Sequence, residues 1–154
     1  MAKIQTVTPA SLDIEEVLSL YNSVGWSAYT DDSVALNSAL RGSATIVEAR
    51  DDSELVGIAR VISDNASICY LQDVLVHPDH QRRGIGRALV IEALGHYPHV
   101  RQKVLITDDE PAQKAFYESL GYKEVAEFGN GTLRAFIRFD HPSSRPGNRS
   151  ANAS

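Results

Sequence analysis

The chain has 154 residues, of which 43% are hydrophobic and 23% charged, and its formal net charge at pH 7 is -5. This length suits one domain that buries its own core without a disulfide or metal staple. The single cysteine excludes a disulfide framework and favours a reducing compartment. The acidic balance argues against nucleic-acid binding. Since no apolar stretch has the length of a signal peptide or membrane span, we expect a cytoplasmic protein with no membrane partner.

The end of the chain differs in composition from the rest. Its last 13 residues, PSSRPGNRSANAS, contain nothing larger than Ala that a core could bury, so burial cannot offset the entropy cost of ordering them. We therefore expect a single folded domain over residues 1–140 and a disordered tail over residues 141–154. Residues 1–140 hold 13 of the 15 basic and all 20 acidic residues, a net charge of -7.

Hydrophobic spacing predicts the elements in chain order. The first half reads as a strand at Lys3–Val7, a helix at 13–23, a loop with the only Trp, a helix at 33–40, and strands at 44–49, 55–62 and 67–76. After a polar loop come a largely buried helix at about 86–94, a strand at 104–107 and a helix at 111–120. Two final strands, 122–128 and 133–139, flank a hairpin turn at 129–132. This order predicts an α+β fold with a mixed sheet.

The loop before the predicted helix at 86–94 carries the chemistry. Two spaced glycines, Gly84 and Gly86, permit positive φ and close backbone approach, and successive free N–H groups with a helix N-terminus suit phosphate oxygens. Arg82, Arg83 and Arg87 concentrate positive charge there. The pattern predicts an anionic ligand with several phosphates, against the alternative of a tight turn with solvated arginines. Neither the Walker pattern nor the dinucleotide fingerprint fits.

Two motifs resemble those of one family. Gln81-Arg82-Arg83-Gly84-Ile85-Gly86 is similar to the pyrophosphate motif Q/R-x-x-G-x-G/A of the GCN5-related N-acetyltransferases (GNAT family). The segment 115–122, AFYESLGY, resembles that family's A-x-x-[FL]-Y-x-x-x-G-[FY] helix end. The order of the predicted elements matches the family over residues 3–139.

The resemblance implies a GNAT fold, whose central, mostly antiparallel sheet splays apart between strands 4 and 5 and is flanked by helices. It implies acetyl-CoA as cosubstrate, with the pantetheine along Val74 and Val76 and a backbone N–H of Leu75 or Val76 on the thioester carbonyl. Many members carry Asn where this chain has Glu110, so that contact departs from the pattern. The implied cofactor-binding residues are Val74, Leu75, Val76, Gln81, Arg82, Arg83, Gly84, Ile85, Gly86 and Arg87.

Acetylation of an amine needs a base and an acid. A lysine-like amine is protonated at pH 7, and freeing its lone pair costs roughly 4–5 kcal/mol. The family places a tyrosine near the CoA sulfur, so Tyr117 is the candidate acid; the alternative is a core aromatic, a role that suits Phe116 better. Asp73 is the candidate base, with a substrate-amine anchor and a structural ion pair as alternatives.

The acceptor-binding residues are predicted around the loop with the only Trp and the strand before the phosphate loop. Trp26 and Tyr29, with the carboxylates of Asp31 and Asp32, suggest an aromatic and acidic wall for a cationic amine. Alternatively, Trp26 packs on the sheet, and Asp31 and Asp32 cap the second helix. Strict alternation along the strand places Tyr70, Gln72 and Val74 on one face, and Leu71, Asp73 and Leu75 on the other. Family members often have a bulge near this point, so the face that meets the acceptor stays open. Tyr70 and Gln72 are the candidate acceptor residues of this strand.

Three functions remain open from the sequence. The first is N-acetylation of a primary amine on a small cationic molecule by direct attack in a ternary complex. The others are acetylation of protein lysines or N-termini and a non-catalytic acyl-CoA-binding regulatory module. Family members are often dimers, so a homodimer is expected by analogy. No metal is expected, because His77 and His80 flank a proline in a loop, and Cys69 suits a core position.

Overall fold

The structure, a computed structural model, describes residues 1–140, and the predicted tail at 141–154 lies outside this range. The chain forms two compact units, Met1–Ile106 and a second that begins at Thr107, which are described separately. Among the described residues, no helix combines the length and apolar character needed to cross a membrane.

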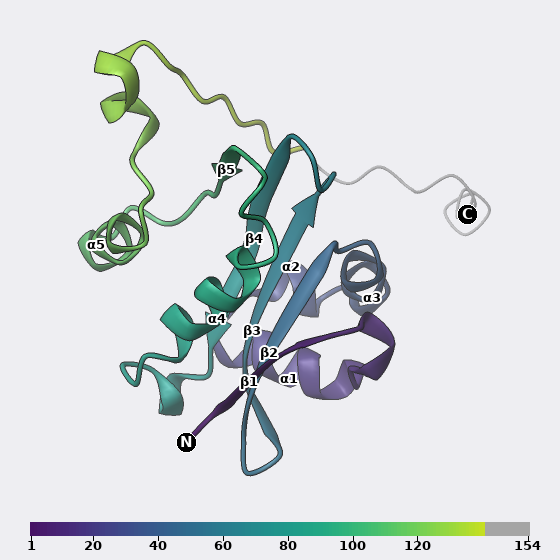
Figure 1. The fold of residues 1–154 in the computed structure, drawn as a ribbon. Coiled ribbons are helices and arrows are strands. Elements are labelled where there is room, and N and C mark those ends of the chain that lie inside the picture. Colours follow the sequence, from purple (N-terminus) through teal and green to yellow (C-terminus); the bar gives the residue numbers. More distant parts are fainter. Residues whose placement is uncertain (141–154) are drawn as a thin grey trace, which may run out of the picture. The chain divides into compact units, whose positions relative to one another are not determined.

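The first unit is built on one mixed sheet of five strands (Figure 1). Neighbouring strands follow one another in sequence, and every pair is antiparallel except β4 with β5. This agrees with the predicted mixed, mostly antiparallel sheet. The strands are β1 (Lys3–Val7), β2 (Thr45–Asp51), β3 (Glu54–Ser63), β4 (Ile68–Val76) and β5 (Gln102–Val104).

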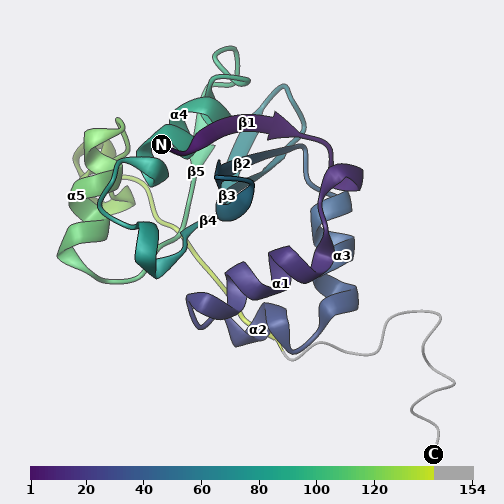
Figure 2. The ribbon, with the colours of Figure 1, turned by 90° about the horizontal axis from the view of Figure 1, so that it is seen from below.

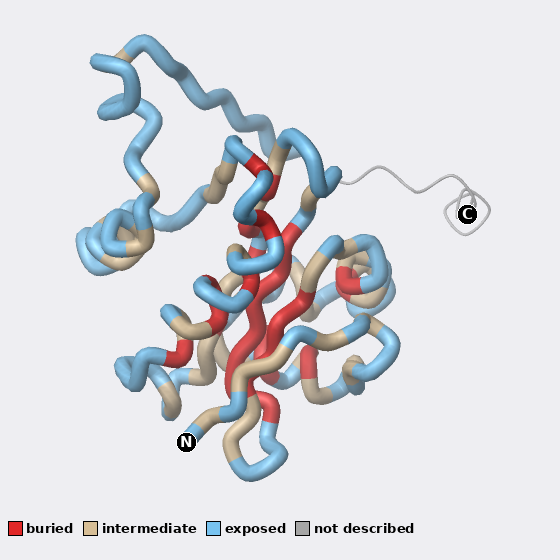
Figure 3. The backbone as a smooth tube through the Cα atoms, in the orientation of Figure 1, coloured by how far each residue is buried: buried red, intermediate tan, exposed pale blue. Residues whose placement is uncertain are grey.

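Helices cover both faces of this sheet (Figure 2). On one face lie α1 (Ile14–Ser23), α2 (Ser27–Thr30) and α3 (Ser33–Arg41), and on the other lies α4 (Ile85–Leu94). The helix α2 forms inside the segment expected to be a loop. Buried residues concentrate along the central strands, where both helical layers pack (Figure 3). Short 3-10 turns occur at Pro9–Ser11 and Pro78–His80.

Side-chain caps fix where two of these helices begin. The Asp13 carboxylate accepts a hydrogen bond from the Glu15 amide at 3.0 Å, and Asp32 accepts one from the Ala35 amide at 2.9 Å. Each bond satisfies a backbone donor that the first helical turn leaves without an intrahelical acceptor. The capping alternative for Asp32 is therefore correct, whereas Asp31 is the C-cap residue of α2 and does not cap α3.

The strands β4 and β5 pair only at the start of β4. The pairing runs from Ile68 with Gln102 to Tyr70 with Val104, so β5 does not accompany the remainder of β4. The sheet thus opens between its fourth and fifth strands, as expected. The predicted fifth strand, 104–107, begins two residues and ends three residues too late, because ladder pairing with β4 rather than the apolar run after Val104 defines this strand.

A β-bulge in β4 changes which residues share a face. Arg60 pairs with Asp73 and Val61 with Leu71, so Gln72 is an extra residue in β4. Strict alternation therefore fails across this point, where the family resemblance allowed for a bulge. Tyr70 lies on the α1–α3 face together with Asp73 and Leu75, while Leu71 and Val74 lie on the α4 face.

The second unit contains α5 (Pro111–Ser119) and a 3-10 segment at Val125–Gly131. Gly129 and Asn130 have φ of 56° and 58°, so the predicted turn residues do adopt left-handed conformations. The predicted strands at 122–128 and 133–139 are nevertheless wrong. Local bonds such as Glu127 N–H to Glu124 O, and ion pairs from Lys114 to Glu124 and Glu127, hold the first segment in place of a strand ladder.

Candidate functional site

Local hydrogen bonds and left-handed backbone shape the loop between β4 and α4. The Gln81 side-chain amide donates to the Val76 carbonyl at 3.0 Å, and the His77 Nδ1 accepts from the Asp79 amide at 3.1 Å. Arg82 has φ 63° and Gly84 has φ 80°, both in the left-handed region. Residues in this region turn successive N–H groups into a concavity, which is a common form of anion site.

The helix α4 begins on a residue that cannot cap it. Gly84 occupies the N-cap position with no side chain to accept from the first amides of the helix. These amides lack intrahelical acceptors and carry the positive end of the helix dipole. Ile85 is buried and anchors the turn, whereas the side chains of Arg82 and Arg83 are exposed. This donor set of backbone amides and arginines fits the pyrophosphate of a nucleotide-containing ligand.

The end of β4 presents amides toward the side that β5 leaves open. The His77 amide donates to the Val56 carbonyl of β3 at 2.8 Å. Because amides alternate in direction along a strand, the Leu75 amide also faces β3, and those of Val74 and Val76 face the open side. An extended ligand could therefore pair with β4 through Val74 and Val76. Of the two amides predicted to meet the thioester, this parity favours Val76 over Leu75.

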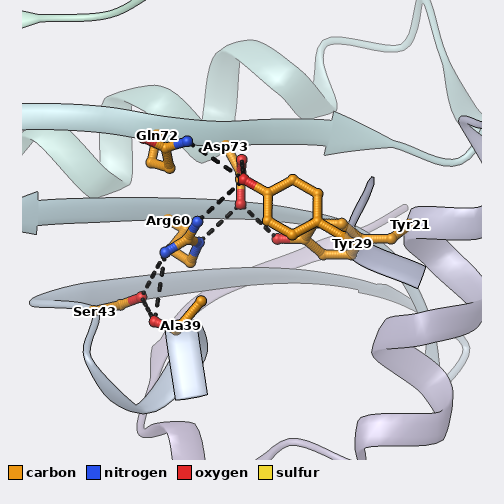
Figure 4. A network of polar contacts seen from close by, with 7 residues as sticks. All are labelled: Tyr21, Tyr29, Ala39, Ser43, Arg60, Gln72 and Asp73. Atoms are coloured by element: carbon orange, nitrogen blue, oxygen red, sulfur yellow. Dashed lines mark hydrogen bonds and ion pairs between the residues drawn. The ribbon is translucent and has the colours of Figure 1, made fainter. Parts of the chain in front are cut away.

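A buried polar network lies on the α1–α3 face below this strand (Figure 4). The Asp73 carboxylate accepts from Tyr21 OH at 2.9 Å and from Arg60 Nε at 2.8 Å on Oδ2, and from Tyr29 OH at 2.8 Å on Oδ1. Asp73 and Arg60 are 3% and 4% exposed. The network is therefore a buried ion pair completed by two phenols, rather than an isolated carboxylate.

The other end of the network fixes the guanidinium and the Tyr29 hydroxyl. Arg60 donates from Nη1 to the Ala39 carbonyl and the Ser43 hydroxyl, both at 3.4 Å, and from Nη2 to Tyr29 OH at 3.3 Å. The side-chain amide of Gln72, the bulge residue, also donates to Tyr29 OH at 3.3 Å. Three elements of one face, β3, β4 and the α2 segment, thus meet at a single phenol.

Burial and charge set the titration of this network. Burial raises the pKa of Tyr21 well above its usual value, and the neighbouring Asp73 charge adds to this. The pKa of Tyr29 is raised for the same two reasons, in the same order. Burial opposes the Arg60 charge, but the Asp73 carboxylate outweighs it and the pKa of Arg60 is raised. Both phenols therefore remain hydrogen-bond donors at neutral pH.

The predicted acceptor residues divide into two groups. Trp26, Tyr29 and Tyr21 form an aromatic cluster whose ring centroids lie 5.1–6.1 Å apart, and the first two pack against the core. Gln72 and Asp73 contact this cluster through Tyr29. Tyr70 lies on the same face but outside the network, and Asp31 is exposed with no side-chain contact to it. Trp26 therefore packs against the core, as the packing alternative predicted.

Tyr117 lies on α5 in the second unit. Its ring centroid is 4.9 Å from that of Phe116 and 6.0 Å from that of Tyr122, and burial raises the pKa of its phenol. Glu110 precedes α5 without a side-chain cap, and Pro111 occupies the first turn. Elsewhere, Cys69 is fully buried as predicted, and residues 1–140 contain no group of three or more His, Cys, Asp or Glu side chains placed to hold a metal ion.

Sequence reasoning missed two members of the network, Tyr21 and Arg60. Tyr21 fits the apolar spacing of the helix predicted at 13–23, so its position alone suggests a core residue. Arg60 stands alone among apolar residues in the predicted strand at 55–62, and a charged side chain at an inward position of a strand usually has a buried partner. This lone arginine was the available signal.

Comparison with known proteins agrees with the two motifs. The sequence model of the "Acetyltransferase (GNAT) domain" matches residues 42–124. The uncharacterized N-acetyltransferase ycf52 of Pyropia yezoensis is 30% identical over 116 residues, which cover 73% of this chain and 66% of that protein. The chain spans between about half and two thirds of the length of several curated relatives it matches.

Solved structures give the same result. The GNAT family acetyltransferase SP0256 from Streptococcus pneumoniae TIGR4 is 30% identical with a TM-score of 0.78, covering 92% of this chain and all of that one. The aminoglycoside N-acetyltransferase AAC(6′)-Iy, solved in complex with CoA, shares the fold at 15% identity with a TM-score of 0.66, covering 92% of this chain and 96% of that one. The chain belongs to the GNAT family of acetyltransferases.

Proposed function

We propose that this protein transfers the acetyl group of acetyl-CoA to a primary amine of a small cationic molecule in the cytoplasm. The single observation that carries the proposal is the loop at 81–87, where left-handed backbone, uncapped helix amides and arginines form a pyrophosphate-binding donor set directly after the open end of β4. The CoA bound by AAC(6′)-Iy, which shares this fold, supports the choice of ligand.

The residues of β4 and of the loop at 81–87 bind different parts of acetyl-CoA. The amides of the turn and the exposed arginines hold the pyrophosphate, and Val74 aligns the pantetheine as an added strand. Acetyl-CoA supplies an acetyl thioester when bound. The Val76 amide donates a hydrogen bond to the thioester carbonyl oxygen, where negative charge grows as the amine attacks.

Proton transfer completes the reaction. A C–N bond to the acetyl group forms as the C–S bond breaks, so the amine must lose a proton and the departing thiolate must gain one. Tyr117 is the proposed acid: its raised pKa keeps the phenol protonated and able to donate at neutral pH. The net charge of -7 over residues 1–140 favours a cationic acceptor through long-range attraction.

The geometry favours the ion-pair alternative for Asp73 over the base. Its carboxylate already accepts three hydrogen bonds, one from a buried guanidinium. Protonating it would leave Arg60 buried without a counter-charge, and breaking such a pair costs about 3–5 kcal/mol. We therefore assign Asp73 a positioning role. The proton of the amine then leaves through water, because the network offers it no free base.

A thiol-release assay with a panel of amines tests the function. We expect acetyl-CoA-dependent thiol release with polyamines or amino sugars and none with uncharged acceptors. Binding of CoA by calorimetry without release for any amine, peptide amines included, would contradict catalysis and favour a regulatory module. Release confined to lysine peptides would replace the small-molecule acceptor with a protein.

Tyr117→Phe tests the acid. Removing a positioned proton donor lowers kcat by about 10²–10⁴-fold, and the matched change Phe116→Tyr, on the neighbouring ring, should leave kcat within about threefold. Unchanged turnover of Tyr117→Phe, measured by thiol release at saturating acetyl-CoA, would remove Tyr117 from the mechanism.

A further inference from the structure

We propose that Arg60, Asp73 and Gln72 form a latch on the Tyr29 hydroxyl that fixes the α2 segment on the sheet and so sets acceptor affinity. In this assignment Tyr29 offers an acceptor its ring and not its hydroxyl. The part that concerns the acceptor rests on the proposed function, whereas the latch itself does not.

The first step is the hydrogen-bonding capacity of one phenol. A tyrosine hydroxyl has one proton to donate and two lone pairs to accept with. The Tyr29 hydroxyl donates to Asp73 Oδ1 and accepts from Arg60 Nη2 and Gln72 Nε2. All of its capacity is used within the protein. A substrate could bond to this oxygen only by displacing one of these three partners.

The second step is the weakness of α2 on its own. The helix has four residues, and its N-cap, Trp26, supplies no side-chain bond. An isolated single turn is not stable in water, because helix nucleation is unfavourable. What holds the segment is therefore tertiary: the Tyr29 hydroxyl bonds and the packing of Trp26 and Tyr29 on the core.

The third step is the bulge. Without an extra residue in β4, Gln72 and Asp73 would lie on opposite faces and could not reach one phenol. The register shift brings Asp73 to the α1–α3 face directly after Gln72, and Figure 4 shows both side chains directed at Tyr29. The bulge thus supplies two of the three partners of the latch.

The fourth step is charge. Asp73 and Arg60 neutralise each other, so the latch presents no net charge to a cationic acceptor. The guanidinium carbon of Arg60 also lies 5.9 Å from the centroid of the Tyr29 ring. Cation binding by this region then uses the exposed parts of the Trp26 and Tyr29 rings, whose position depends on the latch, together with exposed carboxylates such as Asp31.

The test combines Tyr29→Phe with two independent readouts. Trp26 is the only tryptophan of the chain, so its fluorescence reports on the α2 segment whether or not the enzyme turns over. We expect Tyr29→Phe to shift emission to longer wavelength and to raise the acrylamide quenching constant about twofold. The KM for the acceptor should rise about 3- to 10-fold, the loss of about one hydrogen bond, with kcat and the KM for acetyl-CoA within twofold.

Tyr97→Phe is the matched control. The Tyr97 hydroxyl is bonded to Thr45 Oγ1 at 2.5 Å, and Tyr97 is more deeply buried than Tyr29 but lies outside the network. We expect the control to leave Trp26 quenching and the acceptor KM unchanged. Gln72→Ala, at an exposed position, removes one latch partner without risk to folding and should move both readouts in the direction of Tyr29→Phe by a smaller factor.

The outcomes separate the proposals. Unchanged Trp26 quenching in both Tyr29→Phe and Gln72→Ala overturns the latch. Increased quenching with an unchanged acceptor KM overturns its role in acceptor affinity. A wild-type protein that acetylates no amine overturns the proposed function alone, because the fluorescence of the variants still decides the latch.

Discussion

The loop at 81–87 follows the end of β4, the Asp73 network lies on the α1–α3 face of the same strand, and the two are built on opposite physical principles. The loop exposes backbone donors and arginines of one charge, and nothing in its own side chains caps α4. The network buries an ion pair and two phenols that satisfy each other. An anion-binding site must keep hydrogen-bond donors available for its ligand. A network that holds side chains in position must instead satisfy its donors and acceptors within the protein. The comparison shows how one strand can serve both purposes.

Arg60→Met should have the largest effect on stability. It leaves Asp73 buried without its counter-charge, so the free energy of unfolding should fall by about 3–5 kcal/mol. Urea denaturation measures this, and the exposed pair Arg138–Asp140 supplies the control, since Arg138→Met should change little. If Arg60→Met costs no more than Arg138→Met, the ion pair is not what holds the network.

Alkaline pH should weaken the network next. Both Tyr21 and Tyr29 have raised pKa values, while phenols in the unfolded chain titrate near pH 10. Above about pH 10 the unfolded chain releases protons that the folded chain retains, so stability falls as pH rises, by about 1.4 kcal/mol per pH unit for each tyrosine. Denaturation across this range should give a shallower decline for Tyr29→Phe than for the wild type. Equal slopes would contradict the assignment.

Gly84→Ala tests the loop with a matched control. Both Gly84 and Gly25 have φ near 80°, at +80° and +76°, and a Cβ at either position would meet nothing within 4 Å. Each alanine should therefore cost about 1–2 kcal/mol of stability through the left-handed backbone alone. Only Gly84→Ala should weaken CoA binding, by about tenfold in calorimetry, because it disturbs the turn that presents the amides. Equal CoA affinity in both variants would exclude that turn from the site.

Arg83→Gln should have the smallest effect. An exposed charge contributes little to binding and is screened by salt, so CoA affinity should fall about 2- to 5-fold in low salt and less in 0.5 M salt. Arg101→Gln, an exposed arginine in the same unit, should change nothing. A similar loss in both variants would indicate a general charge effect instead of a local contact.

The sequence was informative where structure is local. The loop at 81–87 could be predicted because glycine spacing and the adjoining helix start are neighbours in the chain, and the strand ends of β1 to β4 were found to within about two residues. The Asp73 network could not be predicted from the sequence, because Tyr21 and Tyr29 lie 52 and 44 residues from Asp73 along the chain. The bulge at Gln72 leaves no compositional trace, yet it reverses the face of every residue after it.

The predicted C-terminal hairpin shows that a correctly predicted turn does not establish the strands on either side of it. The turn chemistry of Gly129 and Asn130 was read correctly, but a turn does not make strands. Residues 133–139 alternate well enough for a strand, and Phe136 and Phe139 are 93% and 88% exposed. A strand needs a ladder partner and a buried face, neither of which sequence alternation can supply.

The bulge also decides what β4 is bonded to along its length. Before Gln72, β4 is an interior strand with β3 on one side and β5 on the other. Beyond it, one edge is open, and the pairing of His77 with Val56 turns the amides of Val74 and Val76 rather than Leu75 outward. Deleting Gln72 would leave Leu71 and Asp73 paired with Val61 and Arg60, so these amides would keep their direction. The deletion would instead remove the side-chain amide that bonds to Tyr29, and the open edge would lose this link to the α2 segment.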